Sequence, residues 1–430
     1  MARRSVGLLG LAGLAVATVP LAAPGTGLVP AAADGGPGWL MGIYGGGLGL
    51  SPGAYYCFLW LAFASHLCVF LAAPALDRRL LRGAAIVLLG AFALAPPLLS
   101  QDVFSYIEYA RMGVLHGLDP YTHLPAEAVA DPAFAHVGWP DSTSAYGPLF
   151  TLATYPLAWV SVPVALWTLK GVAASSVLAL AWLVARLAPA RGVDPKRGFT
   201  MVALNPLVLI HVVGGAHNDA TTMLVAMLGV AAVLAARQAA GGFALVSAVA
   251  MKVSAAFVLP FALLGAARHP QRCNAKGAYG PTFTLHLGAG RFLAAGAAAL
   301  AAIGALAWLA FGWSWLDSFA LAGENQARVS NYSLPNLISE ATSIGVDTVR
   351  VAALAAYLAL LGGLLLWVHR GADWIRAAGW AALGLLLASA WLLPWYIVWA
   401  LPFAALSRDY RLISATLALT ALQLAARVPL

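Results

Sequence analysis

An acidic residue stands near the start of a polar stretch that follows a long apolar segment. The stretch reads SQDVFSYIEYARMGVLHGLDPY, residues 100–121, and its first acid is Asp102. We expect Asp102 to lie where a helix meets water, so that its carboxylate can act as a base on a substrate carried by lipid. Alternatively, Asp102 only caps a helix over 103–115 by accepting hydrogen bonds from free backbone amides.

Further side chains around this stretch could bind a substrate. Tyr106 shares a helical face with Asp102, and Arg111 follows one turn later. Tyr146, in AYGPLF, can stack on the face of a sugar ring. The segment GLDPY predicts a structural helix stop, with Gly117 in the left-handed conformation before a turn.

A second polar cluster interrupts two apolar segments in NPLVLIHVVGGAHNDAT, residues 205–221. We expect His217, Asn218 and Asp219 to lie at the outer surface with His211, because an acid, an amide and an imidazole are costly to leave in lipid. They are candidates for substrate binding, and whether Asp219 holds a divalent cation stays open. The alternative is a tight polar turn.

Cations and aromatic side chains form the remaining candidates. Lys252, in AVAMKVSAAF, needs a partner at membrane depth, and a lipid-linked phosphate would suit it; snorkelling towards water is the alternative. Arg328 and Asn331 could belong to a phosphate or sugar lid. Tyr396 lies in LLPWYIVWALP beside Trp395 and Trp399, which could instead form an aromatic belt at the membrane surface.

Composition identifies the elements that must position these residues. Of the 430 residues, 62% are hydrophobic and 9% are charged, against roughly 45–50% and about 25% in soluble domains. This composition predicts an all-α, polytopic membrane protein. The formal charge of +8 does not indicate a nucleic-acid partner, since the basic residues are spread along one predicted membrane face.

Hydropathy predicts about eleven spans, with the N-terminus inside. The spans are at about 5–23, 52–74, 83–99, 163–187, 199–213, 218–236, 292–312, 347–368, 374–393, 395–406 and 411–427. A helical hairpin over 240–250 and 254–266, bent near Lys252, fits among them. The stretch 148–160 is interpreted as a helix lying in the outer interface.

This layout separates the charges. Most of the 24 Lys and Arg fall inside, whereas only Asp77, Asp194, Asp373 and Asp409 of the 16 acids do. The chain therefore forms one integral-membrane domain over 1–430, whose working surface faces outward from two loops, 100–162 and 313–346. The first apolar segment could also be a cleaved signal peptide. The three cysteines are interpreted as packing residues, and no soluble-nucleotide or zinc motif stands out.

The order of these motifs resembles a known family over roughly residues 95–405. The chain has an acid after an early span, followed in order by YGPLF, NPLVLIHVVGGAHNDA, MKVSAAFVLPF and LPWYIVWALP. In this order the chain is similar to the polyprenol-phosphomannose-dependent alpha-(1→6)-mannopyranosyltransferases of the GT-C superfamily. The resemblance implies a GT-C-like bundle in the cell membrane that takes mannose from an outer-leaflet polyprenyl-phosphate donor and extends a lipid-linked, lipomannan-type acceptor.

The chemistry expected from the residues agrees with an inverting transfer. Asp102 would take a proton from the acceptor hydroxyl, and cationic groups would stabilise the leaving phosphate, with no cofactor required. Three alternatives stay open: transfer of another polyprenyl-linked sugar such as arabinose, a flippase or transporter for lipid-linked sugars, and a scaffold for envelope synthesis.

Overall fold

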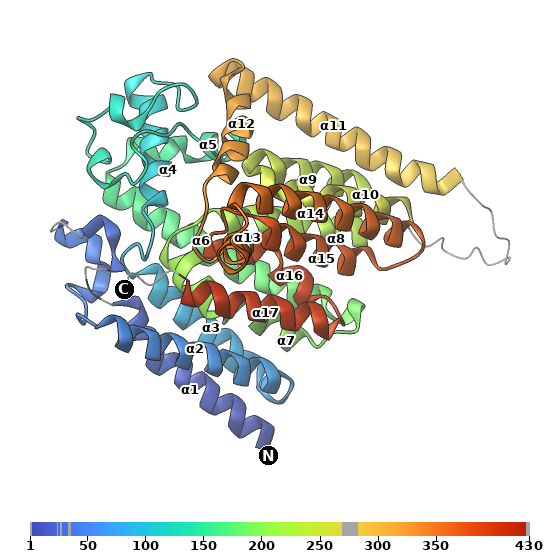
Figure 1. The fold of residues 1–430 in the computed structure, drawn as a ribbon, viewed down its shortest axis with the longest axis horizontal. Coiled ribbons are helices and arrows are strands. Elements are labelled where there is room, and N and C mark those ends of the chain that lie inside the picture. Colours follow the sequence, from blue (N-terminus) through green and yellow to red (C-terminus); the bar gives the residue numbers. More distant parts are fainter. Residues whose placement is uncertain (1, 24, 26–27, 33–35, 269–282, 427–430) are drawn as a thin grey trace.

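The computed structural model describes residues 2–23, 25, 28–32, 36–268 and 283–426, and every regular element in these ranges is helical. The α-helices lie largely side by side in one bundle (Figure 1). Helices α4 and α5 lie at one end of this bundle, and the N-terminus of α1 lies at the other. We refer to these as the α4 end and the opposite end.

The helices of the first half are bounded by residues that favour helix ends. Asp77 and Asp194 each cap a helix by accepting hydrogen bonds from two backbone amides of its first turn. The helices are α1 (Ala2–Ala22), α2 (Pro52–Ala72), α3 (Arg78–Ala93), α4 (Asp102–Arg111), α5 (Pro148–Thr154), α6 (Val162–Leu187), α7 (Pro195–Ala203) and α8 (Asp219–Leu234).

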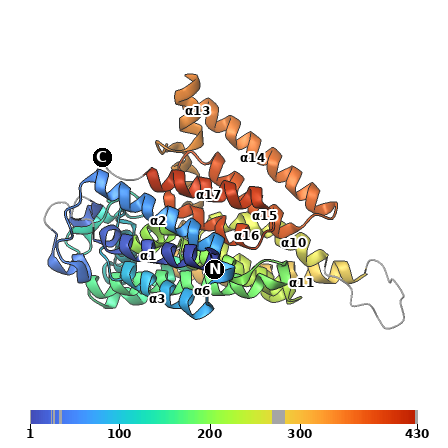
Figure 2. The same ribbon diagram turned by 90° about the horizontal axis from the view of Figure 1, so that it is seen from below.

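The second half continues the bundle and adds an arm. Its helices are α9 (Gln238–Met251), α10 (Leu259–Ala267), α11 (Phe283–Phe311), α12 (Asp317–Glu324), α13 (Leu334–Thr342), α14 (Val346–His369), α15 (Trp374–Ala388), α16 (Leu401–Ala405) and α17 (Tyr410–Ala425). Figure 2 shows α13 and α14 standing out from the remaining helices. Much of α14 is consequently exposed, including Val351 and Leu354.

Short helical turns connect these elements around the α4 end. The turn η5 (Met112–His116) prolongs α4, η8 (Tyr155–Trp159) prolongs α5, and the wider turn η10 (Val208–Gly214) follows α7 at an angle of 57°. The turns η6 (Pro125–Glu127) and η7 (Phe134–His136) lie in the first loop; η12 (Ser314–Leu316) and η13 (Asn325–Ala327) lie in the second. Two further turns are η11 (Val253–Val258) and η14 (Pro394–Trp399).

Several predicted boundaries are confirmed. The helix expected over 103–115 is α4 with η5, and it ends at Gly117, whose φ is +67°. The stretch 148–160 is helical as α5 and η8. The predicted hairpin at Lys252 also forms, since the start of its first arm, at Gln238, and the end of its second arm, at Ala266, both lie beside Gly288. A Cβ built on Gly288 would lie 2.5 Å from the Ala266 carbonyl oxygen and 3.9 Å from Cγ of Gln238.

Among the described residues, five helices are long and apolar enough to cross a membrane, or six if α7 and η10 form one span. The others expected to span are present as shorter apolar helices, so the number eleven stays a prediction. The predicted inner segments do meet at the opposite end. There Arg191 pairs with Asp373, Arg376 pairs with Asp409, and Lys196 donates to the carbonyls of Pro74 and Leu76.

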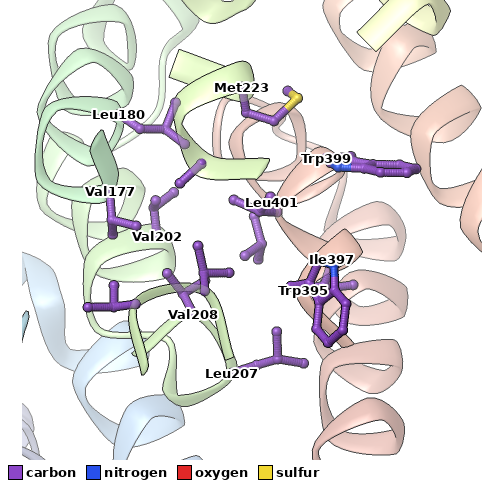
Figure 3. Close-up of a cluster of buried hydrophobic side chains, with 14 of the residues drawn as sticks. Val177, Leu180, Val202, Leu207, Val208, Met223, Trp395, Ile397, Trp399 and Leu401 are labelled. Carbon is purple, nitrogen blue, oxygen red and sulfur yellow. The ribbon is translucent and has the colours of Figure 1, made fainter. Parts of the chain in front are cut away.

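The core lies where α6, α7, η10, α8, η14 and α16 meet (Figure 3). Val177 and Leu180 of α6 face Val208 of η10 and Met223 of α8 in this cluster, and Trp395 and Trp399 extend it from η14. The two tryptophans are only 3% and 5% exposed. The same side chains therefore complete the core and border the site described next.

Candidate functional site

A cavity of about 910 Å³ opens at the α4 end of the bundle. Its walls come from the start of α4, the loop 138–146, the turn at Lys252, the segment 322–328, α14, and residues 385–399. The charged side chains that line it are Asp102, Lys252, Arg328, Asp347 and Arg350. The rest of the lining is mainly aromatic or aliphatic, which is typical of a binding site with a few placed polar groups.

The Asp102 carboxylate is oriented into this cavity by two neighbours. Trp139 donates its indole N–H to Asp102 Oδ1 at 3.0 Å, and His217 Nδ1 lies 3.6 Å from Oδ2. Gln101 occupies the N-cap position, and no side-chain cap bond is made there. The alternative that Asp102 serves as the N-cap is therefore wrong, since it is the first residue inside the helix and its carboxylate is engaged by Trp139.

Asp219 and Lys252 form a buried ion pair beside the cavity. Lys252 Nζ lies 2.7 Å and 2.9 Å from the two Asp219 oxygens, and Trp399 donates to Oδ1 at 2.8 Å. The ammonium also lies 4.8 Å from the centre of the Tyr396 ring. Lys252 thus has a protein partner, Asp219, which the sequence alone did not identify.

The residues 211–219 are not at the surface, contrary to expectation. His211, His217, Asn218 and Asp219 are each at most 4% exposed. The turn that joins η10 to α8 is covered by η14, and His217 stacks on Trp395 with ring centres 3.5 Å apart. The interpretation of Trp395 and Trp399 as a membrane-surface belt is also wrong, because both rings are buried in the cavity wall.

Two arginines line the side of the cavity nearest the second loop. The Arg328 guanidinium lies over the rings of Trp139 and Trp391, at 4.8 Å and 5.9 Å. Trp139 therefore connects Arg328 to Asp102. Arg350, near the start of α14, pairs with Asp347 at 2.6 Å and was missed by the sequence reasoning. The acid three residues before it, at the start of an apolar helix, was the available signal.

Three further predicted residues, Tyr106, Arg111 and Asn331, do not line the cavity. Tyr106 is 2% exposed and packs edge-on against Tyr146, which does line the cavity. Arg111 pairs with Asp131 at 2.8 Å and donates to the Ala158 and Val160 carbonyls. Asn331 uses its carbonyl oxygen to accept a bond from Asn336.

Arg111 and Asp131 belong to a buried charge cluster beneath the first loop. His116 Nε2 also contacts Asp131, at 2.7 Å. Burial and the neighbouring Asp131 carboxylate raise the pKa of Glu108 to about 8. Burial would raise the pKa of Asp131 too, but hydrogen bonds from Arg111, the Ala133 amide and His116 hold it below its ordinary value.

Lys170 was also missed, although a lysine inside an apolar span is itself a signal. It is fully buried in α6, and its ammonium donates to three backbone carbonyls. Among the described residues, no group of three or more His, Cys, Asp or Glu is arranged to hold a metal ion.

The chain matches two family models. The model for the N-terminal domain of alpha-(1→6)-mannopyranosyltransferases matches residues 4–268, and the model for glycosyltransferase family 87 matches residues 145–394. No solved structure matches.

Individual relatives carry the same name. Alpha-(1→6)-mannopyranosyltransferase A of Mycobacterium tuberculosis is 29% identical over 397 residues, which are 85% of this chain and 73% of the relative. The corresponding protein of Corynebacterium glutamicum is 27% identical over 328 residues, 70% of this chain and 66% of the relative. The chain thus spans about two thirds to three quarters of the length of these relatives. The chain belongs to the alpha-(1→6)-mannopyranosyltransferase family of membrane glycosyltransferases.

Proposed function

We propose that this protein transfers mannose from a polyprenyl-phosphate donor to a lipid-linked mannan acceptor of the lipomannan type, with inversion at the anomeric carbon. The observation that carries the proposal is the arrangement of one cavity: the Asp102 carboxylate held by Trp139, cations that line the same cavity, and an apolar wall that continues onto an exposed helix. The proposed site faces outward from a multi-pass bundle in the cell membrane.

In this mechanism Asp102 is the base. The acceptor hydroxyl oxygen attacks the anomeric carbon, the bond from that carbon to the phosphate oxygen breaks with its electron pair going to the phosphate, and the hydroxyl proton passes to Asp102. One carboxylate suffices, because direct displacement forms no covalent intermediate. Trp139 fixes the orientation of Asp102, so the carboxylate is aimed before the acceptor arrives.

The arginines suit the donor phosphate. Arg328 lies over two indole rings, and Arg350 lines the same cavity. A guanidinium can donate two parallel hydrogen bonds to a phosphate, and its charge stabilises the leaving group. Lys252 and Tyr396 also line the cavity, and Lys252 can donate its remaining N–H to the same phosphate or to the sugar.

The apolar wall suits the polyprenyl chain. Val351, Leu354 and Tyr357 of α14 and Leu385 of α15 line the cavity, and Val351 and Leu354 are 69% and 56% exposed on the arm shown in Figure 2. A chain laid along α14 would bury these side chains while its phosphate reaches Arg328. Tyr146 and Tyr109, which also line the cavity, are the proposed platform for the acceptor.

No step of this mechanism passes through a metal. Both oxygens of Asp219, the residue considered for a cation, already accept hydrogen bonds from Lys252 or Trp399.

The test is transfer from labelled polyprenyl-phosphate-mannose to a mannan acceptor by the purified protein, with a polyprenyl-phosphate-arabinose donor alongside. Asp102→Asn keeps the size of the side chain and removes the base, so transfer should fall by about two orders of magnitude or more. Glu340→Gln, an exposed carboxylate away from the cavity, is the matched control. Undiminished transfer by a well-folded Asp102→Asn protein would refute the role of Asp102 as the base. Transfer of arabinose and not of mannose would refute mannose as the transferred sugar.

A further inference from the structure

A fully buried lysine lies close to the site without belonging to it. Lys170 sits in the N-terminal half of α6, is 0% exposed, and does not line the cavity. Its ammonium donates to the Gly214 carbonyl at 2.6 Å, to the Val213 carbonyl at 3.3 Å and to the Pro96 carbonyl at 3.4 Å. Because an ammonium has three donors, these carbonyls can satisfy all of them. The side chain does not reach water, so snorkelling does not account for it.

The three carbonyls belong to two segments that lead into the two acids of the site. Pro96 lies six residues before Asp102, and Gly214 lies five residues before Asp219. The segments are also joined directly, since the Leu98 amide donates to the Gly214 carbonyl at 3.1 Å. They are tightly packed as well: a Cβ on Gly214 would lie 2.9 Å from Leu98 Cδ1.

Both segments hold an unfavourable turn. Leu99 has a φ of +60° and Ala216 has a φ of +57°, and each stands three residues before its acid. A non-glycine residue is strained in this left-handed region, so it persists only where surrounding contacts enforce it. Val213 and Gly214 are also the last residues of η10, and a cation is favoured near the carbonyls at the end of a helix.

We infer that Lys170 is a positioning residue, which fixes the Asp102 and Asp219 segments to one another and so sets the place of the Asp102 carboxylate in the cavity. The inference rests on the proposed function for its kinetic consequence. It assigns Lys170 no contact with donor or acceptor. Its loss should therefore misplace the base and leave the arginines, and with them donor binding, in place.

The test compares Lys170→Met with a control on the same helix. Ser176→Ala removes a part-buried hydrogen bond to Thr221 of α8, 2.9 Å long, and keeps the three carbonyl contacts of Lys170. Lys170→Met should lower kcat at least about tenfold while the donor KM changes by less than about threefold, because small displacements of a reacting group cost rate steeply. Ser176→Ala should change neither. Equal kinetic effects of the two variants, or a raised donor KM with unchanged kcat, would overturn the inference.

A second measurement needs no activity. Backbone hydrogen exchange should rise in Lys170→Met in peptides covering 96–104 and 213–220 together, and not in α9 or α15. If Lys170→Met does not fold, Lys170→Gln, which keeps two N–H donors, should show the same pattern more weakly. Exchange that rises throughout the bundle, or in neither segment, contradicts a positioning role. If wild-type protein transfers no mannose, the proposed function fails, and the exchange result still decides the role of Lys170.

Discussion

Asp219 and Lys252 neutralise one another at the edge of the cavity, and this changes what a single substitution reports. Removing one partner of a buried ion pair costs about 3–5 kcal/mol, mostly because the other charge stays buried without compensation. Asp219 is fully buried, whereas the Lys252 side chain is 14% exposed towards the cavity. A loss of activity in Lys252→Met alone would thus mix stability with substrate binding.

The double variant Asp219→Asn/Lys252→Met separates these effects. We expect Lys252→Met to lower the free energy of unfolding and the double variant to recover most of it, because no buried charge is left. If Lys252 binds the donor phosphate, the donor KM should stay raised in both proteins. The measurements are thermal unfolding in detergent and steady-state kinetics. A donor KM restored to the wild-type value in the double variant would show that Lys252 only balances Asp219.

The pKa of Glu108 predicts a pH dependence of stability. Its value of about 8 in the folded protein lies above the ordinary 4.5, so the folded state binds this proton more tightly than the unfolded state does. The free energy of unfolding should therefore fall as pH rises through this window. Asp131 acts differently: its pKa is lowered from 3.8, so its contribution is lost only in acid.

Glu108→Gln imitates the protonated carboxyl and tests this dependence. We expect the variant to show a flatter stability profile between about pH 5 and pH 9, and to exceed the wild type in stability at the upper end. Unfolding temperature measured across that range gives the result, with Glu340→Gln as the exposed control. Parallel profiles for wild type and Glu108→Gln would mean that Glu108 does not carry the excess proton.

At the scale of elements, the loop that carries Tyr146 is fixed against the Lys252 hairpin by a glycine. The Gly147 amide donates to the Met251 carbonyl at 3.1 Å. A Cβ on Gly147 would lie 2.2 Å from the Ala250 carbonyl oxygen, a contact that real structures do not tolerate. The close approach of the two backbones allows Tyr146 and Lys252 to line the same cavity.

Gly147→Ala should separate these two elements. Its φ of −67° suits alanine, so the harm comes from the contact and not from the backbone conformation. We expect a loss of about 1–3 kcal/mol in stability and a reduced rate of transfer. Gly171→Ala is the matched control, because that glycine lies in α6 with no atom near its Cβ position, and alanine there should be neutral or stabilising by up to about 1 kcal/mol. Equal behaviour of the two variants would contradict the close approach.

These elements also show what sequence can and cannot predict. Helix stops at Gly117 and Gly214 and the reversal at Lys252 follow from local signals, since glycine conformation and hydropathy act over a few residues. The partners of Asp102 and Lys252 do not follow from local signals. Trp139 and Asp219 reach them across 37 and 33 residues, and such pairs depend on how the helices pack.

The whole molecule separates its charges between its two ends. The first and second loops meet at the α4 end, where the hydroxyl of Ser314 donates to Asp119. The arginines near η9 (Pro189–Arg191) meet Asp373 and Asp409 at the opposite end. Basic segments are retained on the cytoplasmic side of membranes, so this separation supports an outward-facing cavity. The orientation itself is a prediction.

Three alanine-to-cysteine substitutions test that orientation. Ala130 lies in the first loop, Ala341 in α13 and Ala190 beside Arg191, and all three are exposed, so reactivity reports the side of the membrane and not burial. In a background in which Cys57, Cys68 and Cys273 are replaced, an impermeant thiol reagent added to intact cells should label Ala130→Cys and Ala341→Cys. Ala190→Cys should react only after the membrane is opened, because the basic segment holds it inside. Labelling of Ala190→Cys alone in intact cells would show that the bundle has the inverted orientation. The cavity would then face inside, where an outer-leaflet donor could not reach it. Labelling of Ala130→Cys without Ala341→Cys would instead show that the two loops lie on different sides of the membrane, although the Asp119–Ser314 contact joins them. The proposed cavity would then lack one of its walls.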